Sequence, residues 1–264
     1  MAQERRVFLS STTNPATSSP AAGTHNSEAE VGAVVTLDEV ESHHLLQVLR
    51  LAVGAPVVAI DPHSRKLFRS SIVSNQGFVI LKLEEELPGL QPHNRNDTLV
   101  APLLKGDHIE FIIEKATELG IHAIKLYQAE RSVVKIKAED AAVKCARWER
   151  IGLSAAKQCR RESLPIISLA QSLEAALEGA IGGFYASLQS SALEIAKAPP
   201  PKSATHLVTG PEGDFSPAEE LLLANRGFIP VSLGALVLRA ETAAMVMATT
   251  ALTLWGERDW DEVP

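Results

Sequence analysis

The sequence predicts an α/β protein in two parts: a small β-barrel or sandwich over residues 1–90 and a largely parallel α/β sheet over residues 91–264. In the first part, short segments rich in Val, Ile and Phe lie between turn residues, a pattern typical of small all-β folds. After residue 96, apolar runs of strand length alternate with stretches of helical spacing. That alternation favours parallel strands with helices on both faces of the sheet.

The first part has one expected helix, over residues 42–51, and a segment of different composition at residues 11–30. This segment is mostly Ser, Thr, Ala, Pro and Gly. Because such residues bury too little apolar surface to offset the entropy of ordering, we expect a mobile loop. The acidic run Glu84–Glu86, followed by Pro88 and Gly89, predicts a linker between the parts. The expected strands cover residues 5–10, 33–37, 56–61, 67–74 and 77–83.

The second part begins with an apolar strand over residues 98–104 and a helix over residues 109–119, which Gly120 ends. The run Ser-Pro-Ala-Glu at residues 216–219 starts another helix on two counts. It is a capping box, and it places proline at the first helical position. The other expected strands cover residues 123–129, 182–188, 205–210 and 228–234, and the other helices cover residues 141–158 and 243–254.

Several classes of protein are disfavoured by the sequence. Its apolar runs are shorter than the roughly 18 residues that a membrane helix needs. The first residues, MAQERRVFLSST, have neither the apolar core nor the cleavage pattern of a secretory signal. Cys145 and Cys159 make neither a disulfide framework nor a four-ligand metal set. We therefore expect a cytoplasmic, reduced and metal-free protein.

The charge distribution is uneven along the chain. The net charge of −7 argues against nucleic acid as a partner, but the distribution matters more than the sum. Acidic residues dominate from Pro211 onward, whereas residues 131–161 are strongly basic. This block predicts one electropositive face, and a solvated helix surface is the alternative reading. Its bases are Arg131, Lys135, Lys137, Lys144, Arg147, Arg150, Lys157, Arg160 and Arg161.

Two glycine-containing loops follow predicted strands of the parallel sheet. The first is Gly210-Pro211-Glu212-Gly213, and the second begins at Leu233-Gly234 and leads into a helix near Arg239 and Glu241. Ligands of open α/β sheets bind at the carboxyl ends of strands, so the two loops can face one pocket. A simple tight turn and a surface ion pair are the alternative readings. The sequence has neither the dinucleotide-binding glycine fingerprint nor the P-loop motif.

These loops also carry a resemblance to a known family. The segments GPEGDFSPAEE (210–220) and LGALVLRAETA (233–243) resemble the cofactor motifs of the bacterial 16S rRNA (uracil-N3)-methyltransferase family, in the SPOUT class. Three further segments are similar to that family: HHLLQVLRL (43–51) together with the opening RRVF, KATELGIHAIKLYQAERSVVK (115–135) and RWERIGLSAAKQCRRESLP (147–165). The family usually reads GPEGG, so Asp214 is a departure from its pattern.

The resemblance implies an architecture and an activity. The second part would be a SPOUT-type sheet threaded into a trefoil knot, which is rare among folds, and the first part a PUA-like, RNA-binding β-barrel. The chain would transfer a methyl group from S-adenosyl-L-methionine to N3 of a uridine in 16S rRNA, free or in the small ribosomal subunit. It would act as a homodimer with active sites near the interface. The alternative is a non-catalytic RNA-binding protein that retains this fold.

The resemblance also implies roles for residues. Arg161 would stabilise the uracil anion and Arg131 is the second candidate. Glu241 or Glu212 would be the general base, or a structural carboxylate that pairs with Arg239. His44 and Trp148 are expected to pack in cores, and stacking on an RNA base is the alternative for Trp148. The expected RNA-binding residues are Arg6, Arg50, Arg131, Arg160 and Arg161. The expected cofactor-binding residues are Thr209, Gly210, Pro211, Glu212, Gly213, Leu233, Gly234, Leu238, Arg239, Thr242 and Ala243.

Overall fold

The computed structural model describes residues 5–9, 29–62, 64, 66–89 and 96–255. The segment expected to be a mobile loop, residues 11–30, lies almost entirely outside the described residues. The chain divides into two compact units. The first comprises Met1–Leu90 and the short segment Arg160–Ser163, and the second comprises Gln91–Cys159 and Leu164–Pro264. Each unit is described by itself.

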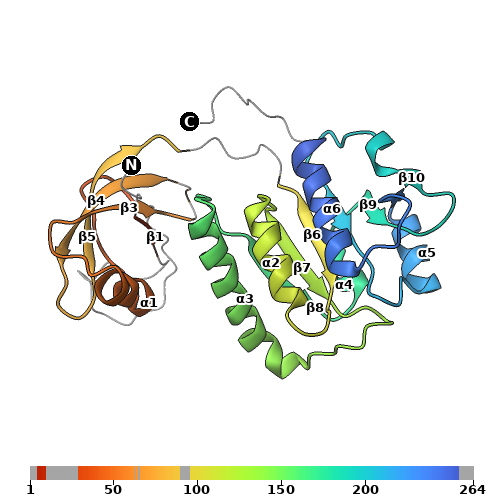
Figure 1. Cartoon of the computed structure of the whole chain (residues 1–264), viewed down its shortest axis with the longest axis horizontal. Coiled ribbons are helices and arrows are strands. Elements are labelled where there is room, and N and C mark those ends of the chain that lie inside the picture. Colours follow the sequence, from red (N-terminus) through yellow and green to blue (C-terminus); the bar gives the residue numbers. More distant parts are fainter. Residues whose placement is uncertain (1–4, 10–28, 63, 65, 90–95, 256–264) are drawn as a thin grey trace. The chain divides into compact units, whose positions relative to one another are not determined.

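The first unit is built on a five-stranded curled sheet, and each segment predicted to be a strand forms one (Figure 1). The sheet has the order β1-β3-β4-β5-β2. The pair β1–β3 is parallel and the other pairs are antiparallel. Among the described residues, β1 and β2 pair with no further strand, so they form the edges of the curled sheet. The strands are β1 (Arg6–Phe8), β2 (Val34–Thr36), β3 (Pro56–Ile60), β4 (Leu67–Ser74) and β5 (Ile80–Leu87).

The helix of the first unit begins earlier than predicted. Helix α1 (Glu39–His43) starts after Asp38, whose carboxylate accepts a hydrogen bond from the Glu41 amide at 2.8 Å, a typical N-terminal cap. A π-helical turn, η1 (His44–Val48), continues it and buries Leu45 in the core. The expectation that His44 packs in the core is wrong, because the helix turns this side chain to the exposed side.

The acidic run Glu84–Glu86 belongs to strand β5, so its prediction as a linker is wrong. Its side chains are exposed, and two of them are paired across the sheet. Glu85 forms an ion pair with Arg69 at 3.2 Å, and Glu84 accepts a hydrogen bond from Ser71 at 2.5 Å. Cross-strand partners of this kind stabilise an acidic strand that sequence composition alone would assign to a loop.

The second unit contains a seven-stranded parallel sheet, as predicted, in the order β10-β12-β9-β11-β6-β7-β8. The late strand β11 lies between β6 and β9, so the strand order does not follow the chain, and the trefoil knot stays a prediction. The sequence did not predict β8 or β10. The strands are β6 (Thr98–Pro102), β7 (Ala123–Tyr127), β8 (Ile166–Ala170), β9 (Gly183–Ala186), β10 (Leu193–Glu194), β11 (His206–Val208) and β12 (Phe228–Ser232).

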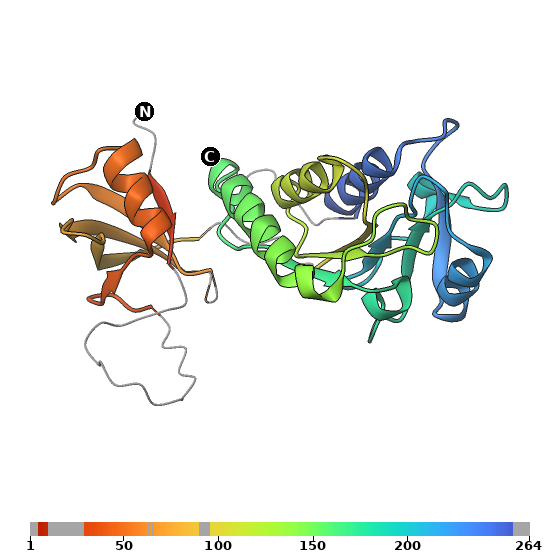
Figure 2. The ribbon, with the colours of Figure 1, turned by 90° about the horizontal axis from the view of Figure 1, so that it is seen from below.

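Helices cover both faces of this sheet (Figures 1 and 2). Successive residues of β6 enter opposite cores, Leu99 and Ala101 on one side and Val100 on the other, because side chains alternate along a strand. The first core includes Trp148, which is buried as expected. It is covered by α2 (His108–Glu118), α3 (Ala138–Gln158) and α6 (Ala240–Thr253), and the second core by α4 (Leu173–Ala176) and α5 (Pro217–Asn225). The short 3₁₀ helix η2 (Ile195–Lys197) follows β10.

The start of α5 fixes the segment that follows β11. The predicted capping box is present: Ser216 Oγ accepts from the Glu219 amide at 3.2 Å, and Glu219 Oε2 accepts from the Ser216 amide at 2.9 Å. The other carboxylate oxygen of Glu219 accepts from the Glu130 amide at 3.0 Å. A single buried carboxylate thus joins the loop after β7 to the loop after β11.

Candidate functional site

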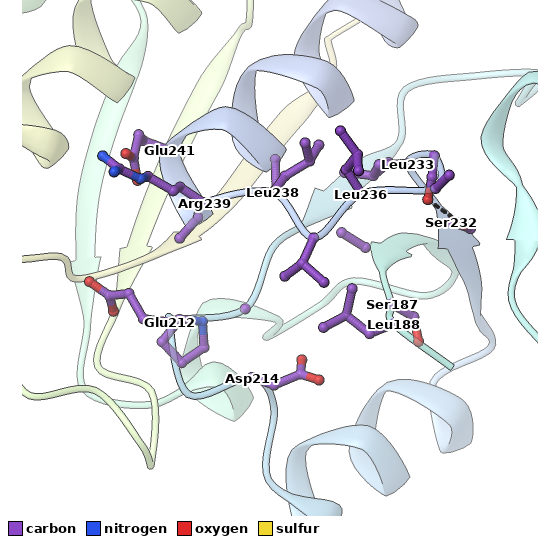
Figure 3. A pocket seen from close by; sticks show the side chains of 18 of the residues that line it. Ser187, Leu188, Glu212, Asp214, Ser232, Leu233, Leu236, Leu238, Arg239 and Glu241 are labelled. Carbon is purple, nitrogen blue, oxygen red and sulfur yellow. Dashed lines mark hydrogen bonds between the residues drawn. The ribbon is translucent and has the colours of Figure 1, made fainter. Parts of the chain in front are cut away.

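A cavity of about 680 Å³ lies at the carboxyl ends of three parallel strands (Figure 3). The residues that follow β9, β11 and β12 form its walls, and the first turns of α2 and α6 complete it. The two glycine loops therefore line the same cavity, as the sequence predicted. The lining residues are His108, Ala186, Ser187, Leu188, Gly210, Pro211, Glu212, Asp214, Ser232, Leu233, Gly234, Ala235, Leu236, Val237, Leu238, Arg239, Ala240, Glu241 and Ala243.

Most of the residues expected to bind a cofactor line this cavity, and three do not. Thr209 is fully buried at the end of β11, while Gly213 and Thr242 are exposed. The eight that line it are Gly210, Pro211, Glu212, Leu233, Gly234, Leu238, Arg239 and Ala243.

The turn after β11 has a tightly specified backbone. The Asp214 amide donates to the Pro211 carbonyl at 2.9 Å, which closes the turn. Asp214 itself has a φ of 59°, in the left-handed region, which Asp and Asn tolerate better than most residues. At Gly210, a Cβ atom would lie 3.1 Å from the Phe215 ring. A side chain at position 210 would therefore press against the Phe215 ring, and Asp214 is one of the few side chains that its own position accepts.

Arg131 holds this turn from outside the cavity. Its guanidinium donates to the Gly213 carbonyl at 3.1 Å and to the Phe215 carbonyl at 3.0 Å. A Cβ atom on Gly213 would lie 3.3 Å from Arg131 Cβ, so the loop after β7 and the turn after β11 are in close contact here. Arg131 was expected to contact substrate or RNA. In the structure it bonds the backbone of the candidate cofactor loop.

The loop after β12 leads into α6 and is largely apolar and exposed. Leu236 and Val237 are each 78% exposed, and Gly234 has a φ of 130°. Arg239 occupies the N-cap position of α6 and makes no side-chain capping bond. Among the described residues its guanidinium has no hydrogen-bond or ion-pair partner.

Glu241, in the first turn of α6, forms an ion pair with His108 Nδ1 at 3.4 Å. The alternative in which Glu241 pairs with Arg239 is therefore wrong, because the first turn of α2 brings His108 beside the carboxylate instead. The Glu241 side chain is 15% exposed and that of His108 is 40% exposed. Sequence reasoning missed His108, although its position just after the loop that follows β6 placed it at the same edge of the sheet.

The cavity has a charged end and an apolar end. Figure 3 shows Glu212, Arg239 and Glu241 on one side, and Leu233 and Leu236 on the other. The carboxylates that line it belong to Glu212, Asp214 and Glu241, and the basic side chains to Arg239 and His108. A ligand with an apolar ring at one end and charged groups at the other matches this arrangement.

The hydroxyl of Thr209, the residue before the lining residue Gly210, is buried without a partner among the described residues. The backbone carbonyl of Thr209 accepts from the Tyr127 hydroxyl at 2.9 Å. Burial raises the pKa of Tyr127 well above its ordinary value, and the carboxylates of Glu219 and Asp214 raise it further, so this hydroxyl remains a donor. An unpaired buried hydroxyl is costly and is the kind of group that a bound ligand satisfies.

The remaining predicted residues are not in the cavity lining. Arg161 belongs to the segment that groups with the first unit, and its Nε donates to Ser163 Oγ at 3.3 Å. Arg50 and Arg160 are exposed, with φ values of 52° and 61°. Arg6 lies in β1 and is partly exposed. The roles of these four residues in catalysis or RNA binding stay predictions.

The described part of the chain shows neither a cluster of metal ligands nor a membrane-spanning helix. No group of three or more His, Cys, Asp or Glu side chains there is placed to hold a metal ion. None of its helices combines the length and the apolar character needed to cross a membrane.

Comparison with known proteins identifies the family. A family model described as RNA methyltransferase domain matches residues 91–252. This chain belongs to that RNA methyltransferase family. It is 32% identical over 230 residues to the ribosomal RNA small subunit methyltransferase E of Bacillus subtilis, covering 78% of this chain and 84% of the relative. The protein of the same name from Mycobacterium tuberculosis is 31% identical, with 82% and 85% covered.

A solved relative confirms the fold of this RNA methyltransferase. The ribosomal RNA small subunit methyltransferase E of Neisseria gonorrhoeae, crystallised with bound S-adenosylmethionine, matches with a TM-score of 0.81 at 26% identity. The match covers 96% of this chain and 98% of the solved chain. The curled N-terminal sheet and the parallel C-terminal sheet with its helices are thus both features of the family.

The contacts of Arg131 yield a test of the loop. We expect Arg131→Ala to speed amide hydrogen exchange at Asp214 and Phe215 by roughly tenfold or more, because charge-assisted hydrogen bonds are worth about 1.5–3 kcal/mol. Exchange measured by NMR or mass spectrometry checks this. Arg150→Ala, which removes an exposed guanidinium from α3, is the matched control. Unchanged exchange at both amides in Arg131→Ala would show that the guanidinium does not hold the turn.

Proposed function

We propose that this chain transfers a methyl group from S-adenosyl-L-methionine to N3 of a uridine in 16S rRNA of the small ribosomal subunit. The observation that carries the proposal is the single cavity formed by both glycine loops at the carboxyl ends of β11 and β12. In this proposal, residues 91–264 bind the cofactor and perform the transfer, and residues 1–90 bind RNA. Activity on ribosomal RNA implies a place in the cytoplasm.

The cavity fits the cofactor in four respects. Leu233 and Leu238 offer an apolar surface to the adenine ring, and the backbone of the two loops offers amides and carbonyls. Arg239 has no partner among the described residues and matches the carboxylate of the methionine part. The buried Thr209 hydroxyl also lacks a partner in that part of the chain and gains one if a ligand group or an ordered water enters. Thr242 and Gly213 complete the set of proposed cofactor-binding residues. Gly213 belongs to the set because it is part of the turn after β11.

The cofactor supplies a methyl group on a positively charged sulfur, so the protein contributes mainly by positioning the reactants. The uridine must lose the proton on N3, and a cation near the uracil carbonyls stabilises the anion that forms. Arg161 is the proposed cation. Arg131, the second candidate, is already bonded to the backbone of the turn. Glu241, held by His108, is the proposed base, with Glu212 as its rival.

The proposed RNA contacts come from the basic residues of the chain. Arg6, Arg50, Arg131, Arg160 and Arg161 are the predicted ones, and the exposed Lys144 and Arg150 add positive charge on α3. Phosphate contacts of this kind give RNA binding that weakens with salt, by roughly 0.7 to 0.9 in log K per contact and tenfold in salt. The alternative function, RNA binding without methyl transfer, requires only this surface. The cavity formed by the two glycine loops supports the enzyme over this alternative, because RNA binding alone needs no such cavity.

We also infer that the chain acts as a homodimer. Leu236 and Val237, both highly exposed, lie on the loop that lines the cavity, and apolar side chains in such a place suit an interface between copies. Light scattering should give twice the chain mass. The double variant Leu236→Glu, Val237→Glu should give a monomer, and Ile181→Glu, which changes another highly exposed residue, should not. A monomeric unmodified chain would refute the inference.

The role of Arg161 separates transition-state stabilisation from RNA binding. If Arg161 stabilises the uracil anion, Arg161→Ala should lower the single-turnover methylation rate by about 10²–10³, the typical loss for one preorganised donor. Arg161→Lys should rescue only in part, because a point charge does not reproduce the planar guanidinium. The rate is measured at saturating RNA, with cofactor affinity determined separately.

Arg150→Ala is the control for the loss of one positive charge, since Arg150 is exposed on α3. It should weaken RNA binding at most and leave the saturated rate unchanged. A saturated rate for Arg161→Ala equal to that of the unmodified chain would exclude the catalytic role. RNA positioning would then account for Arg161.

A further inference from the structure

Asp214 is a carboxylate in the wall of the cavity without a cation of its own. One of its oxygens accepts from the Phe215 amide at 2.8 Å, and the second has no such bond. Among the described residues it has no ion-pair partner. Arg131, although it bonds the residues on both sides of Asp214, directs its guanidinium to their carbonyls. Within the described part of the chain, the carboxylate of Asp214 therefore has no paired cation.

The backbone around Asp214 holds this charge in place. The turn is closed by the bond from the Asp214 amide to the Pro211 carbonyl, and the residue itself has a φ of 59°. Its bond to the Phe215 amide further restricts the side chain. In Figure 3 the carboxylate extends from the turn toward the side of the cavity that Ser187 and Leu188 line.

The charge of Asp214 also acts on groups around the cavity. It contributes to raising the pKa of Tyr185, after burial and Glu220, and that of Tyr127, after burial and Glu219. Both hydroxyls therefore stay protonated and add no charge of their own near the carboxylate. The other charged or titratable side chains in the cavity wall are Glu212, Glu241, Arg239 and His108, and His108 is paired with Glu241. Three carboxylates line the cavity together with one guanidinium and one imidazole, so acidic side chains outnumber basic ones in its wall.

We propose that Asp214 makes the cavity prefer the positively charged cofactor S-adenosylmethionine over its neutral product, S-adenosylhomocysteine. The proposal rests on the proposed function and names a specificity-determining residue for it. In methyl transfer the carbon–sulfur bond breaks and its electron pair stays on sulfur, while the carbon bonds to N3 and the N3 proton passes to a base. The ligand thereby loses one positive charge. An unpaired carboxylate in the wall attracts the ligand before transfer more strongly than after it.

Equilibrium binding measures this preference directly. Calorimetry is performed on the purified chain and on Asp214→Asn with three ligands: S-adenosylmethionine, S-adenosylhomocysteine and sinefungin, an unreactive analogue with an ammonium near the position of the sulfonium. Asparagine tolerates the left-handed backbone and keeps an oxygen for the Phe215 amide, so only the charge is removed. We expect Kd to rise about two- to fivefold for the two cations, as for one partly exposed charge pair, and to stay unchanged within error for the neutral product.

Two further variants make the test specific. Asp214→Gly relieves the left-handed backbone, removes the same charge and should lose the same preference. Asp140→Asn, an equal change at an exposed position of α3, should leave all three affinities unchanged. An equal loss for cations and neutral product would mean that Asp214 contacts a part common to all ligands, and no loss would mean that it contacts none. Either result overturns the proposal. An unmodified chain that bound none of the ligands would instead refute the proposed function.

Discussion

The turn after β11 is held in shape by two side chains. One comes from the loop after β7, and the other comes from helix α5, which follows the turn. The Arg131 guanidinium, from the loop after β7, bonds the carbonyls of Gly213 and Phe215. The Glu219 carboxylate, in the first turn of α5, bonds the amides of Ser216 and Glu130. These bonds join two neighbouring loops at one edge of the sheet. Without them the turn could not present Gly210 and Asp214 to the cavity in a fixed geometry.

The same arrangement explains how three strand ends make one site. Parallel strands bring their carboxyl ends to the same edge of the sheet, so the loops after β9, β11 and β12 meet although they are distant in sequence. The interleaved strand order places β11 beside β9 and β6. Apolar side chains from the β12 loop then face charged groups from the β11 turn and from α6. A cavity with two chemically different ends follows from the topology.

Sequence patterns predicted most of this unit because its signals are local. The capping box at Ser216 and the helical spacing after Ile109 depend on neighbouring residues alone, and both are present. Strand β8 was missed because it lies at the edge of the sheet, with Ile166 exposed, and β10 because it has two residues. The pairing of His108 with Glu241 joins residues that are far apart in sequence. No local pattern specifies such a pair.

In the first unit, local sequence patterns predicted the strands but failed at two places where tertiary structure decides. Its five strands were predicted from composition, but the acidic end of β5 was not, because Arg69 and Ser71 stabilise it from the neighbouring strand. His44 was expected in the core, and the register of α1 and its π-helical turn exposes it. In β5, contacts with the neighbouring strand override the local preference. At His44, the helix begins about one turn earlier than predicted, which changes the side of the helix that this residue occupies.

Methyl transfer to N3 of uridine can be measured on the ribosomal RNA itself. Small ribosomal subunits lacking the modification are incubated with the purified chain and deuterated S-adenosylmethionine, and the 16S rRNA is digested to nucleosides for mass spectrometry. We expect 3-methyluridine to be the only labelled nucleoside, and we expect no label in reactions that lack the chain. Label on another base or on ribose, or no label on any nucleoside, would contradict this expectation.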